Sequence, residues 1–343
     1  MDNNFIKICN SLKKEIDSSN KIVLTTHFNP DGDGLGSAIA FFHYLSDIKK
    51  ESKVIVDSHI THPYDSLDMT SDVEVYSTEL HDLWLSDVDL IIVFDIGDLK
   101  RIGSLYSLLQ KDGIRSVSID HHPPRNSEVL NINMVYDSAP ATGYIVWKFL
   151  NTISLYNKIY PLKIGRPLYM SLITDTGSFK YSNTTSDAHM MAANLIESGV
   201  KGYEIQRDIY EQQKFISILL LSKVVQDLNC SKNMKVVWTI ITQNMLEEIG
   251  ASEHDIDGIT EYIRSIKNVE ISFMVLELSD GSYRINFRSS GNYSVNDIAE
   301  IFKGGGHKFA AGARIDKTFS INEIEQKILA VINSKIPGEV DVN

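Results

Sequence analysis

Short apolar runs separated by polar loops divide the first half of the chain into alternating strands and helices. The runs with the length and composition of buried strands are residues 22–24, 54–56, 90–94 and 116–119. The patterns typical of helices lie near residues 5–16, 37–42, 141–155 and 162–173. A continuous apolar run such as 90–94 is expected for a central strand of a parallel sheet, which is buried on both faces. The alternation therefore predicts an α/β fold with a mostly parallel sheet flanked by helices.

A second structural unit is predicted in the last third of the chain. Strands are expected at residues 234–240, 269–278 and 282–288, and helices near 254–266, 295–303 and 320–332. A length of 343 residues fits two domains better than one. We therefore expect an N-terminal domain over 1–200, a helical connector over 201–228 and a smaller C-terminal α/β domain over 229–343.

Composition narrows the classes of protein that this chain can represent. The net charge of −12 argues against binding long nucleic acid, which needs a basic face, but leaves room for a small phosphorylated substrate. No stretch reaches the ~20 apolar residues of a membrane span, and the N-terminus lacks the pattern of a signal peptide. The two cysteines, Cys9 and Cys230, are far apart and have no metal-type spacing. A cytoplasmic protein without a membrane partner is therefore expected.

Four clusters of acids and histidines follow the apolar segments of the first half. Their chemistry-bearing residues are His27, Asp31 and Asp33, then Asp95, then Asp120, His121 and His122, then Asp175. Three clusters follow predicted strands, and the fourth ends a predicted helix. Because ligands of an α/β sheet bind at the carboxyl ends of its strands, we expect these side chains to converge. Carboxylates held that close would repel one another, and a metal ion is the usual remedy.

Simpler interpretations of the first cluster compete with a metal site. A calcium loop starting at Asp31 needs an acid at its twelfth position, which is Phe42, and a dinucleotide fingerprint needs a glycine where Ser37 stands. No Gly-Lys-Ser/Thr phosphate loop occurs in the cluster. A solvated turn in which an aspartate of the Asp31-Gly-Asp33 stretch caps a helix remains the bland alternative, and Asp98 and Asp175 are also candidate helix caps.

The number and type of the clustered side chains favour two metal ions over one. Histidine and carboxylate ligands without cysteine suit Mn²⁺, Mg²⁺ or a similar divalent cation. Two-metal sites with ions ~3.5–4 Å apart typically hydrolyse phosphate esters. Asp120 can orient a neighbouring imidazole, which is a frequent arrangement beside metal ligands.

A glycine-rich segment in the last third is the second functional signal. Residues 303–313 read Lys-Gly-Gly-Gly-His-Lys-Phe-Ala-Ala-Gly-Ala, and the glycines allow the backbone to approach a ligand closely. Residues 282–314 contain five Lys/Arg and two Asp/Glu, a local excess of +3 in an acidic chain. Arg288 and Ser289 end a predicted strand, and arginine suits bidentate phosphate contacts. This segment is expected to anchor a substrate, although a glycine-rich loop alone is often only a loop.

The order of these motifs resembles that of the DHH phosphoesterase superfamily, which is named for its Asp-His-His motif. The Gly-Gly-Gly-His segment resembles its DHHA1 domain, and the chain is most similar to the nanoRNase/pAp phosphatase branch. The resemblance implies one metal held by His27, Asp31 and Asp95 and another held by Asp33, Asp95, His121 and Asp175. It also implies catalytic roles for Asp95, Asp120 and His122. The substrate-binding residues that it implies are His122, Arg288, Ser289, Gly305, Gly306 and His307.

The resemblance also implies an activity and leaves alternatives open. It implies Mn²⁺-dependent hydrolysis of short oligoribonucleotides and of 3′-phosphoadenosine 5′-phosphate, with Mg²⁺ or Co²⁺ as substitutes, and allows a homodimer. A linear or cyclic dinucleotide phosphodiesterase and an exopolyphosphatase-like hydrolase share the metal motifs and remain alternatives. A non-catalytic nucleotide-binding module is the alternative from another class. The Ser-Arg-Lys-Lys segment of family II pyrophosphatases is missing from this sequence.

Overall fold

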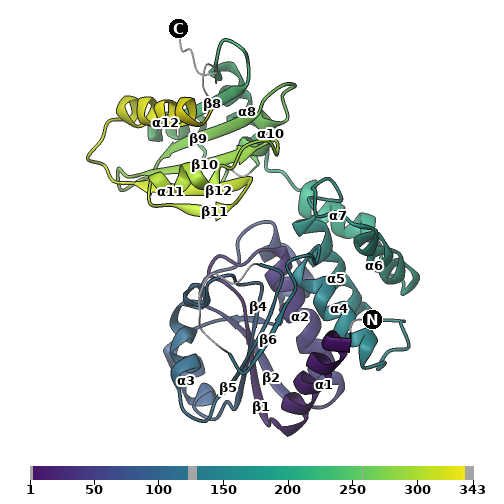
Figure 1. Cartoon of the computed structure of the whole chain (residues 1–343). Coiled ribbons are helices and arrows are strands. Elements are labelled where there is room, and N and C mark those ends of the chain that lie inside the picture. The colour runs from purple at the N-terminus through teal and green to yellow at the C-terminus, as the bar shows by residue number, and fades with distance from the viewer. Residues whose placement is uncertain (1–2, 123–129, 257, 337–343) are drawn as a thin grey trace. The chain divides into compact units, whose positions relative to one another are not determined.

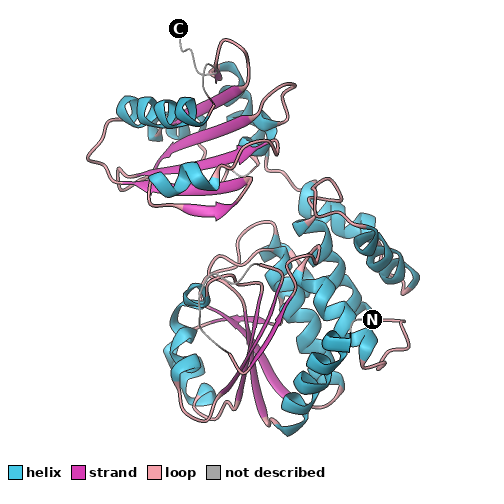
Figure 2. Ribbon diagram, in the orientation of Figure 1, coloured by secondary structure: helices cyan, strands magenta, loops and turns pink. Residues whose placement is uncertain are grey.

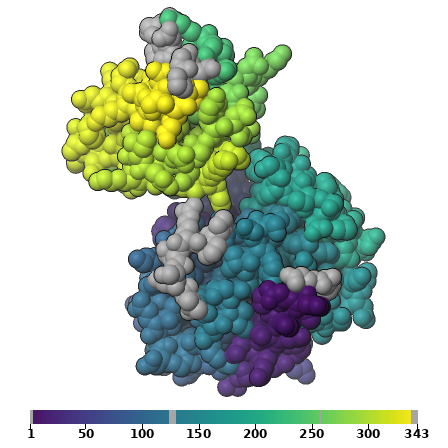
Figure 3. Space-filling model, viewed as in Figure 1, coloured from purple at the N-terminus to yellow at the C-terminus, as the bar shows by residue number. Residues whose placement is uncertain are grey.

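The computed structural model describes residues 3–122, 130–256 and 258–336, so residues 337–343 of the predicted C-terminal domain lie outside the described part. The chain divides into two compact units, Met1–Gln212 and Gln213–Asn343 (Figure 1). The boundary falls within the segment 201–228, for which the sequence predicts a helical connector. Each unit is a compact body, as the space-filling view illustrates (Figure 3).

The first unit is built on a six-stranded parallel sheet. Its strands are β1 (Lys21–Thr25), β2 (Glu51–Val56), β3 (Val73–Val75), β4 (Leu90–Phe94), β5 (Arg115–Asp120) and β6 (Ile132–Val135). They lie in the order β3-β2-β1-β4-β5-β6, and every neighbouring pair is parallel. From β1 the chain adds strands first on one side of the sheet (β2, β3) and then on the other (β4, β5, β6). Open α/β sheets bind ligands at this switch point, between β1 and β4. Thr25 pairs with Val93 and Phe94 with Ile119, so β1, β4 and β5 end at the same level.

Helices cover both faces of this sheet, as predicted (Figure 2). One face packs against α1 (Asn3–Ser18), α2 (Gly32–Asp47), α4 (Thr142–Thr152) and α5 (Leu162–Asp175), with α6 (Ser186–Glu197) and α7 (Gly202–Tyr210) beyond them. The other face packs against α3 (Thr78–Leu85) and the 3-10 segment η3 (Leu99–Gln110), while η1 (Tyr64–Ser66) and η2 (Asp68–Thr70) are short 3-10 turns. Side chains alternate between the faces, so Ile22 and Leu24 join the first core and Val23 joins the second.

The second unit contains a mixed six-stranded sheet. Its strands are β7 (Asn229–Cys230), β8 (Val236–Ile241), β9 (Ile271–Glu277), β10 (Tyr283–Ser289), β11 (Gly305–His307) and β12 (Ala310–Ile315), in the order β11-β12-β10-β9-β8-β7. Only the β8–β9 pair of these described strands is parallel. Helices α11 (Asn296–Ile301) and α12 (Ile321–Lys335) pack on one face, and α8 (Phe215–Gln226), α9 (Gln243–Ile249) and α10 (Ile259–Arg264) on the other. Within the described ranges, no helix has the length and apolarity that crossing a membrane requires.

Three helices of the first unit meet closely at small residues. A Cβ atom added to Gly36 of α2 would lie 2.3 Å from the carbonyl oxygen of Pro167 in α5. A Cβ atom added to Gly143 of α4 would lie 2.1 Å from Ser171 Oγ. Glycine at these positions therefore lets α2, α4 and α5 approach until Ser171 reaches the first turn of α2, where its hydroxyl donates to Asp33.

This packing predicts that Gly36→Ala destabilises the protein. Alanine favours a helix by about 1 kcal/mol over glycine, but overpacking a close helix contact costs about 1–3 kcal/mol, so we expect a net loss in the free energy of unfolding measured with urea. Gly305→Ala is the matched control, because its added Cβ would have only Asn296 Oδ1 nearby, at 3.9 Å. An unchanged or higher stability of Gly36→Ala would contradict the close packing of α2 against α5.

Candidate metal centre

The loop after β1 brings His27 and Asp31 together at the start of α2. Asp31 caps this helix, since its Oδ1 accepts hydrogen bonds from the backbone N–H groups of Asp33 and Gly34, both at 3.1 Å. The bland interpretation of Asp31 as a helix cap is therefore correct, but it is incomplete. The second oxygen, Oδ2, lies 3.5 Å from His27 Nε2. One carboxylate thus serves the helix with one oxygen and faces an imidazole with the other.

The imidazole of His27 is oriented so that its lone pair faces carboxylate oxygens. Its Nδ1 lies 2.9 Å from the carbonyl oxygen of Phe28, which can only accept, so Nδ1 carries the proton. In the neutral ring, Nε2 is then an acceptor, and it lies 3.5 Å from Asp31 Oδ2 and 3.8 Å from Asp95 Oδ2. Three acceptors that face one another at this distance define a position for a cation.

Asp95 lies at the centre of the site and faces a different group with each of its oxygens. It follows β4 directly, is 2% exposed, and has a φ of +55°, a conformation that costs a non-glycine residue about 1–3 kcal/mol. Its backbone N–H donates to the carbonyl of Ile119 at 3.1 Å, and Thr142 Oγ1 donates to its Oδ1 at 3.1 Å. Oδ2 faces His27, whereas Oδ1 lies 3.5 Å from His121 Nε2. This is the geometry expected of a carboxylate that bridges two ions.

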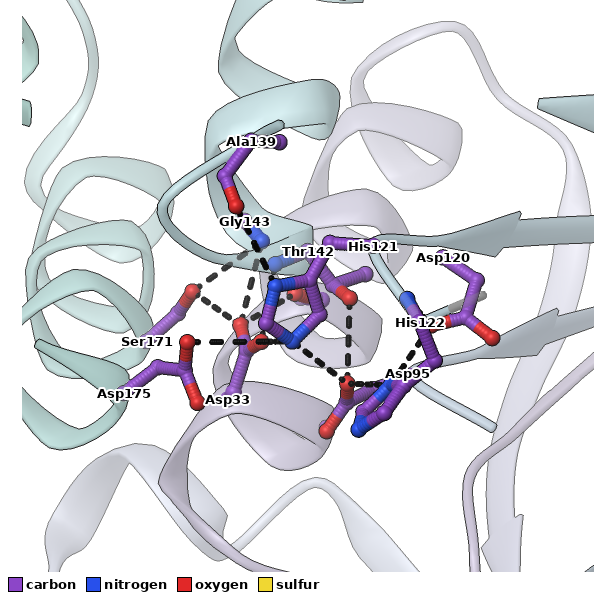
Figure 4. A network of polar contacts seen from close by, with 12 residues as sticks. Asp33, Asp95, Asp120, His121, His122, Ala139, Thr142, Gly143, Ser171 and Asp175 are labelled. Carbon is purple, nitrogen blue, oxygen red and sulfur yellow. Dashed lines mark hydrogen bonds and ion pairs between the residues drawn. The ribbon is translucent and has the colours of Figure 1, made fainter. Parts of the chain in front are cut away.

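A second group of ligand atoms surrounds His121 (Figure 4). Its Nδ1 lies 3.2 Å from the carbonyl oxygen of Ala139, which leaves the lone pair on Nε2 in the neutral ring. Nε2 is buried and has no hydrogen-bond partner among the described residues. It lies 3.7 Å from Asp33 Oδ2, 3.5 Å from Asp95 Oδ1 and 3.7 Å from Asp175 Oδ2. Ligand atoms that bind one ion at about 2.1 Å lie roughly 3–4 Å apart. A divalent cation therefore fits this position.

Burial and mutual repulsion disturb the titration of the carboxylates. Burial, with the charges of Asp95 and Asp175, raises the pKa of Asp33 well above its ordinary value. Burial, with the negative charge of Asp95, also raises the pKa of Asp175 to about 7, although His121 opposes the shift. Burial alone would raise the pKa of Asp95, but a hydrogen bond from His122 and the charges of nearby histidines hold it well below its usual range. Asp33 and Asp175 therefore hold their protons to a higher pH than ordinary aspartates do, whereas Asp95 does not.

Asp120 orients His122 at the rim of the same site. Asp120 Oδ1 accepts from both the backbone N–H and Nδ1 of His122, each at 2.9 Å, as the sequence predicts for an acid beside an imidazole. His122 Nδ1 also lies 3.3 Å from Asp95 Oδ1. Burial would lower the pKa of His122, but the carboxylates of Asp120 and Asp95 outweigh it and raise the pKa to about 10. His122 thus holds a proton beside the candidate metal ligands.

The start of α4 positions several of these groups, and the sequence analysis did not identify it. Ala141 precedes the helix and has no side chain that could cap it. Asp33 takes this role from 109 residues away, since it accepts from the N–H groups of Thr142 at 2.8 Å and Gly143 at 3.1 Å. The hydroxyl of Ser171 also donates to it. In the sequence, the only sign of this contact is the Thr142-Gly143 pair at the predicted start of a helix.

Asn183 is a second positioning residue that the sequence analysis missed. Its amide nitrogen lies 2.9 Å from Asp175 Oδ2, 3.0 Å from the Asp175 carbonyl oxygen and 2.9 Å from that of Pro140. It therefore ties Asp175, the last residue of α5, to the loop before α4. The hydroxyl groups of the neighbouring Thr174 and Thr176 donate to carbonyl groups of α5.

The predicted substrate residues of the second unit lie on neighbouring strands. His307 of β11 pairs with Ala310 of β12, which pairs with Arg288 of β10, so the three residues form one row across the sheet. Arg288 Nε donates to Glu261 of α10, and its Nη1 lies 2.9 Å from the Phe287 carbonyl oxygen.

The other predicted residues of this group have contacts within the sheet. Ser289 is buried, and its hydroxyl accepts from the N–H of Gly291 at 3.2 Å. Gly305 and Gly306 belong to edge strand β11, where the sequence predicted a loop. A Cβ atom at Gly306 would lie 2.5 Å from the Ala310 carbonyl oxygen, so close strand packing explains this glycine.

Comparisons with known proteins agree with the order of these two units. The model of the DHH family, N-terminal domain, matches residues 21–172, and the model of the DHHA1 domain matches residues 233–336. The chain is 26% identical over 318 residues to the bifunctional oligoribonuclease and PAP phosphatase NrnA of Thermus thermophilus, covering 92% of this chain and 90% of that protein. It is 25% identical over 294 residues to the protein of the same name from Bacillus subtilis, covering 86% and 89%.

A solved structure shares the fold over nearly the whole chain. The crystal structure of an exopolyphosphatase-related protein from Bacteroides fragilis has a TM-score of 0.90, with 24% sequence identity, and the match covers 96% of this chain and 97% of that chain. The two domain matches and the full-length relatives lead to one assignment. This chain belongs to the DHH phosphoesterase family, in the branch that joins a DHH domain to a DHHA1 domain and includes the NrnA proteins.

Proposed function

We propose that this chain is a two-metal phosphoesterase that hydrolyses short oligoribonucleotides and 3′-phosphoadenosine 5′-phosphate. Membership of the DHH family makes it a hydrolase. The observation that carries the two-metal proposal is the pair of imidazole lone pairs, on His27 and His121, that face opposite oxygens of Asp95. The names of the Thermus and Bacillus relatives support the choice of substrate.

The ligand assignment follows from the two groups of facing atoms. We assign His27, Asp31 and Asp95 to one ion. Asp33, Asp95, His121 and Asp175 would hold the second. Oxygen and nitrogen donors without thiolates suit Mn²⁺, with Mg²⁺ or Co²⁺ as substitutes. When bound, two such ions neutralise an attacked phosphoryl group and lower the pKa of a bound water.

His122 is proposed to supply the proton that the leaving group needs. Asp120 fixes the ring through Nδ1, so Nε2 is directed away from Asp120. A cationic imidazole can stabilise negative charge on a phosphoryl oxygen and then transfer a proton to the departing oxygen. The same hydrogen bond, donated by His122 to Asp120, keeps the ring in one orientation and favours its protonated form.

Arg288 is proposed to bind the substrate's second phosphate or terminal nucleotide. Its Nε and Nη1 are held by Glu261 and the Phe287 carbonyl, so the guanidinium is fixed before a ligand arrives. A fixed fork loses less entropy on binding a phosphate than a mobile one. His307 lies in the same row of the sheet and is proposed to assist.

The first prediction is a pattern of turnover across substrates. In Mn²⁺ we expect hydrolysis of di- to pentaribonucleotides and 3′-phosphoadenosine 5′-phosphate, and not of pyrophosphate.

Asp95→Asn should reduce turnover at least 10³-fold, because both proposed ions lose a ligand. Arg288→Ala should raise KM roughly 10- to 100-fold, the loss of about 1.5–3 kcal/mol from a charged hydrogen bond. Preference for cyclic dinucleotides or polyphosphate would change the substrate assignment, and no turnover would favour a binding module.

The second prediction separates the two roles of Asp31. Asparagine caps helices as well as aspartate does but offers no anionic ligand. Asp31→Asn should therefore keep the unfolding midpoint of the protein in EDTA and lose one of two tightly bound Mn²⁺ ions in isothermal titration calorimetry. Asp31→Ala should lose the same ion and also about 1 kcal/mol of stability in EDTA. Two tight ions in Asp31→Asn would remove Asp31 from the ligand set.

The third prediction concerns the pH dependence of metal binding. Asp175 has a raised pKa of about 7 in the metal-free protein, so it is mostly protonated at pH 6 and mostly ionised at pH 8. Because the ion binds the ionised form, Mn²⁺ affinity should rise at least about tenfold from pH 6 to pH 8, with proton release on binding. Titrations in buffers of different ionisation enthalpy measure both quantities. An affinity independent of pH would show that no acid in the centre gives up a proton to the ion.

A further inference from the structure

One face of strand β10 presents three polar side chains in a line. Arg284, Asn286 and Arg288 are half-buried and alternate with fully buried residues that point into the core of the second unit. Side chains of a strand stand roughly perpendicular to the sheet, so these three point to the same side. Arg284 and Arg288 are four residues apart, which places their Cα atoms about 13 Å from each other.

The outer strands leave this face open beside the three residues. The residues that register with them on β12 and β11 are half-exposed or exposed: Ala310, Gly312, Arg314, Gly305 and His307. Most of them are small, and none is acidic. The residues of β9 that pair with Arg284, Asn286 and Arg288 are buried, on the side of the sheet that α8, α9 and α10 cover. The open part of the face is therefore lined by small residues and by three arginines, of which Arg288 is paired with Glu261 and Arg314 with Asp280.

Two of the three residues on β10 lack partners among the residues that the structure describes. Arg284 Nε is buried and has no acceptor. The side-chain amide of Asn286 makes no hydrogen bond with any described residue. Arg288, in contrast, is held by Glu261, and Arg314 donates through Nε to Ser282 Oγ at 3.0 Å and through Nη2 to Asp280. Unlike Arg288 and Arg314, Arg284 therefore makes no side-chain hydrogen bond to a described residue, and its guanidinium is not committed to a protein acceptor.

We propose that Arg284 and Asn286 form an additional subsite that binds a second phosphate group of an oligonucleotide, beyond the group bound at Arg288. The proposal rests on the proposed function and deepens it. The side chains of Arg284 and Arg288 start about 13 Å apart and point in the same direction, so they do not bind the same phosphate. A ligand that occupies both positions must therefore carry at least two separated phosphates. Arginine supplies the charged donors, and the Asn286 amide can donate to a phosphate oxygen or pair with a sugar hydroxyl.

If this subsite exists, Arg284 distinguishes long substrates from short ones. A pentaribonucleotide can reach from Arg288 to Arg284, whereas a single nucleotide with two phosphates is bound mainly through Arg288. Arg284→Gln should therefore raise KM for a pentaribonucleotide about 5- to 20-fold, change that for 3′-phosphoadenosine 5′-phosphate less than twofold, and leave kcat for both within twofold. Asn286→Asp, which places a negative charge on the face, should shift the same ratio of KM values in the same direction.

The test combines kinetics with direct binding. Arg284→Lys keeps the charge and should restore most of the affinity. Lys335→Gln removes one positive charge from α12, on the opposite face of the sheet, and is the matched control that should not change the ratio. Binding of a labelled pentaribonucleotide to Asp95→Asn, with and without Arg284→Gln, measures affinity without turnover. Equal losses for both substrates, or no loss in Arg284→Gln and Asn286→Asp, would overturn the subsite.

The outcomes also separate this inference from the proposed function. If the natural sequence hydrolyses neither short RNA nor 3′-phosphoadenosine 5′-phosphate in Mn²⁺, the proposed function fails. Suppose that it hydrolyses both, and that Arg284→Gln has the same melting temperature and the same ratio of the two KM values as the natural sequence. In that case only the subsite fails. If Arg284→Gln has a lowered melting temperature, the KM ratio of Asn286→Asp and the binding assay decide whether the subsite exists.

Discussion

The burial of several carboxylates around Asp95 is the constraint on which the first unit depends. Ionised acids in a low-dielectric site repel one another and lose their hydration, and each penalty amounts to several kcal/mol. The fold offsets part of this cost with backbone N–H groups. Asp33 accepts from the start of α4, and Asp31 from the start of α2, so each acid lies at the positive end of a helix. What remains uncompensated is the set of oxygens that face His27 and His121, where positive charge fits.

The acids of the centre divide their oxygens between folding and chemistry. Asp31 uses Oδ1 for its helix and Oδ2 for His27, and Asp95 presents one oxygen to each imidazole. Asp33 is held on both oxygens by the first turn of α4, yet its Oδ2 also faces His121. The positions of the candidate ligand oxygens are thus fixed by hydrogen bonds that the fold needs in any case. For the same reason, truncating Asp31 or Asp33 would disturb a helix as well as a candidate metal position.

The sequence predicts the parts of the site that follow directly from strand ends. An apolar strand followed at once by Asp95, and another that leads into Asp120 and His121, is enough to place these residues at one edge of a parallel sheet. It does not predict the supporting contacts. The bond between Asp33 and Thr142 spans 109 residues and depends on how three helices pack. Glycine reports only that the backbone is permissive, so the sequence could not tell that Gly305 and Gly306 belong to a strand rather than a loop.

Under the proposed function, charge balance gives a reason for phosphate-binding residues outside the metal centre. Two divalent cations would carry four positive charges, and the proposed carboxylate ligands Asp31, Asp33, Asp95 and Asp175 carry four negative ones. The remaining pair, Asp120 and protonated His122, also cancels. The loaded centre is then close to neutral, so it can polarise one phosphoryl group but has no excess charge for further phosphates. In a chain of net charge −12, that excess must be local. Charges separated by more than ~8–10 Å are largely screened at physiological salt, so under the proposed function the arginine-bearing face of β10 would attract a short anion, while the acidic remainder of the surface would disfavour a long one.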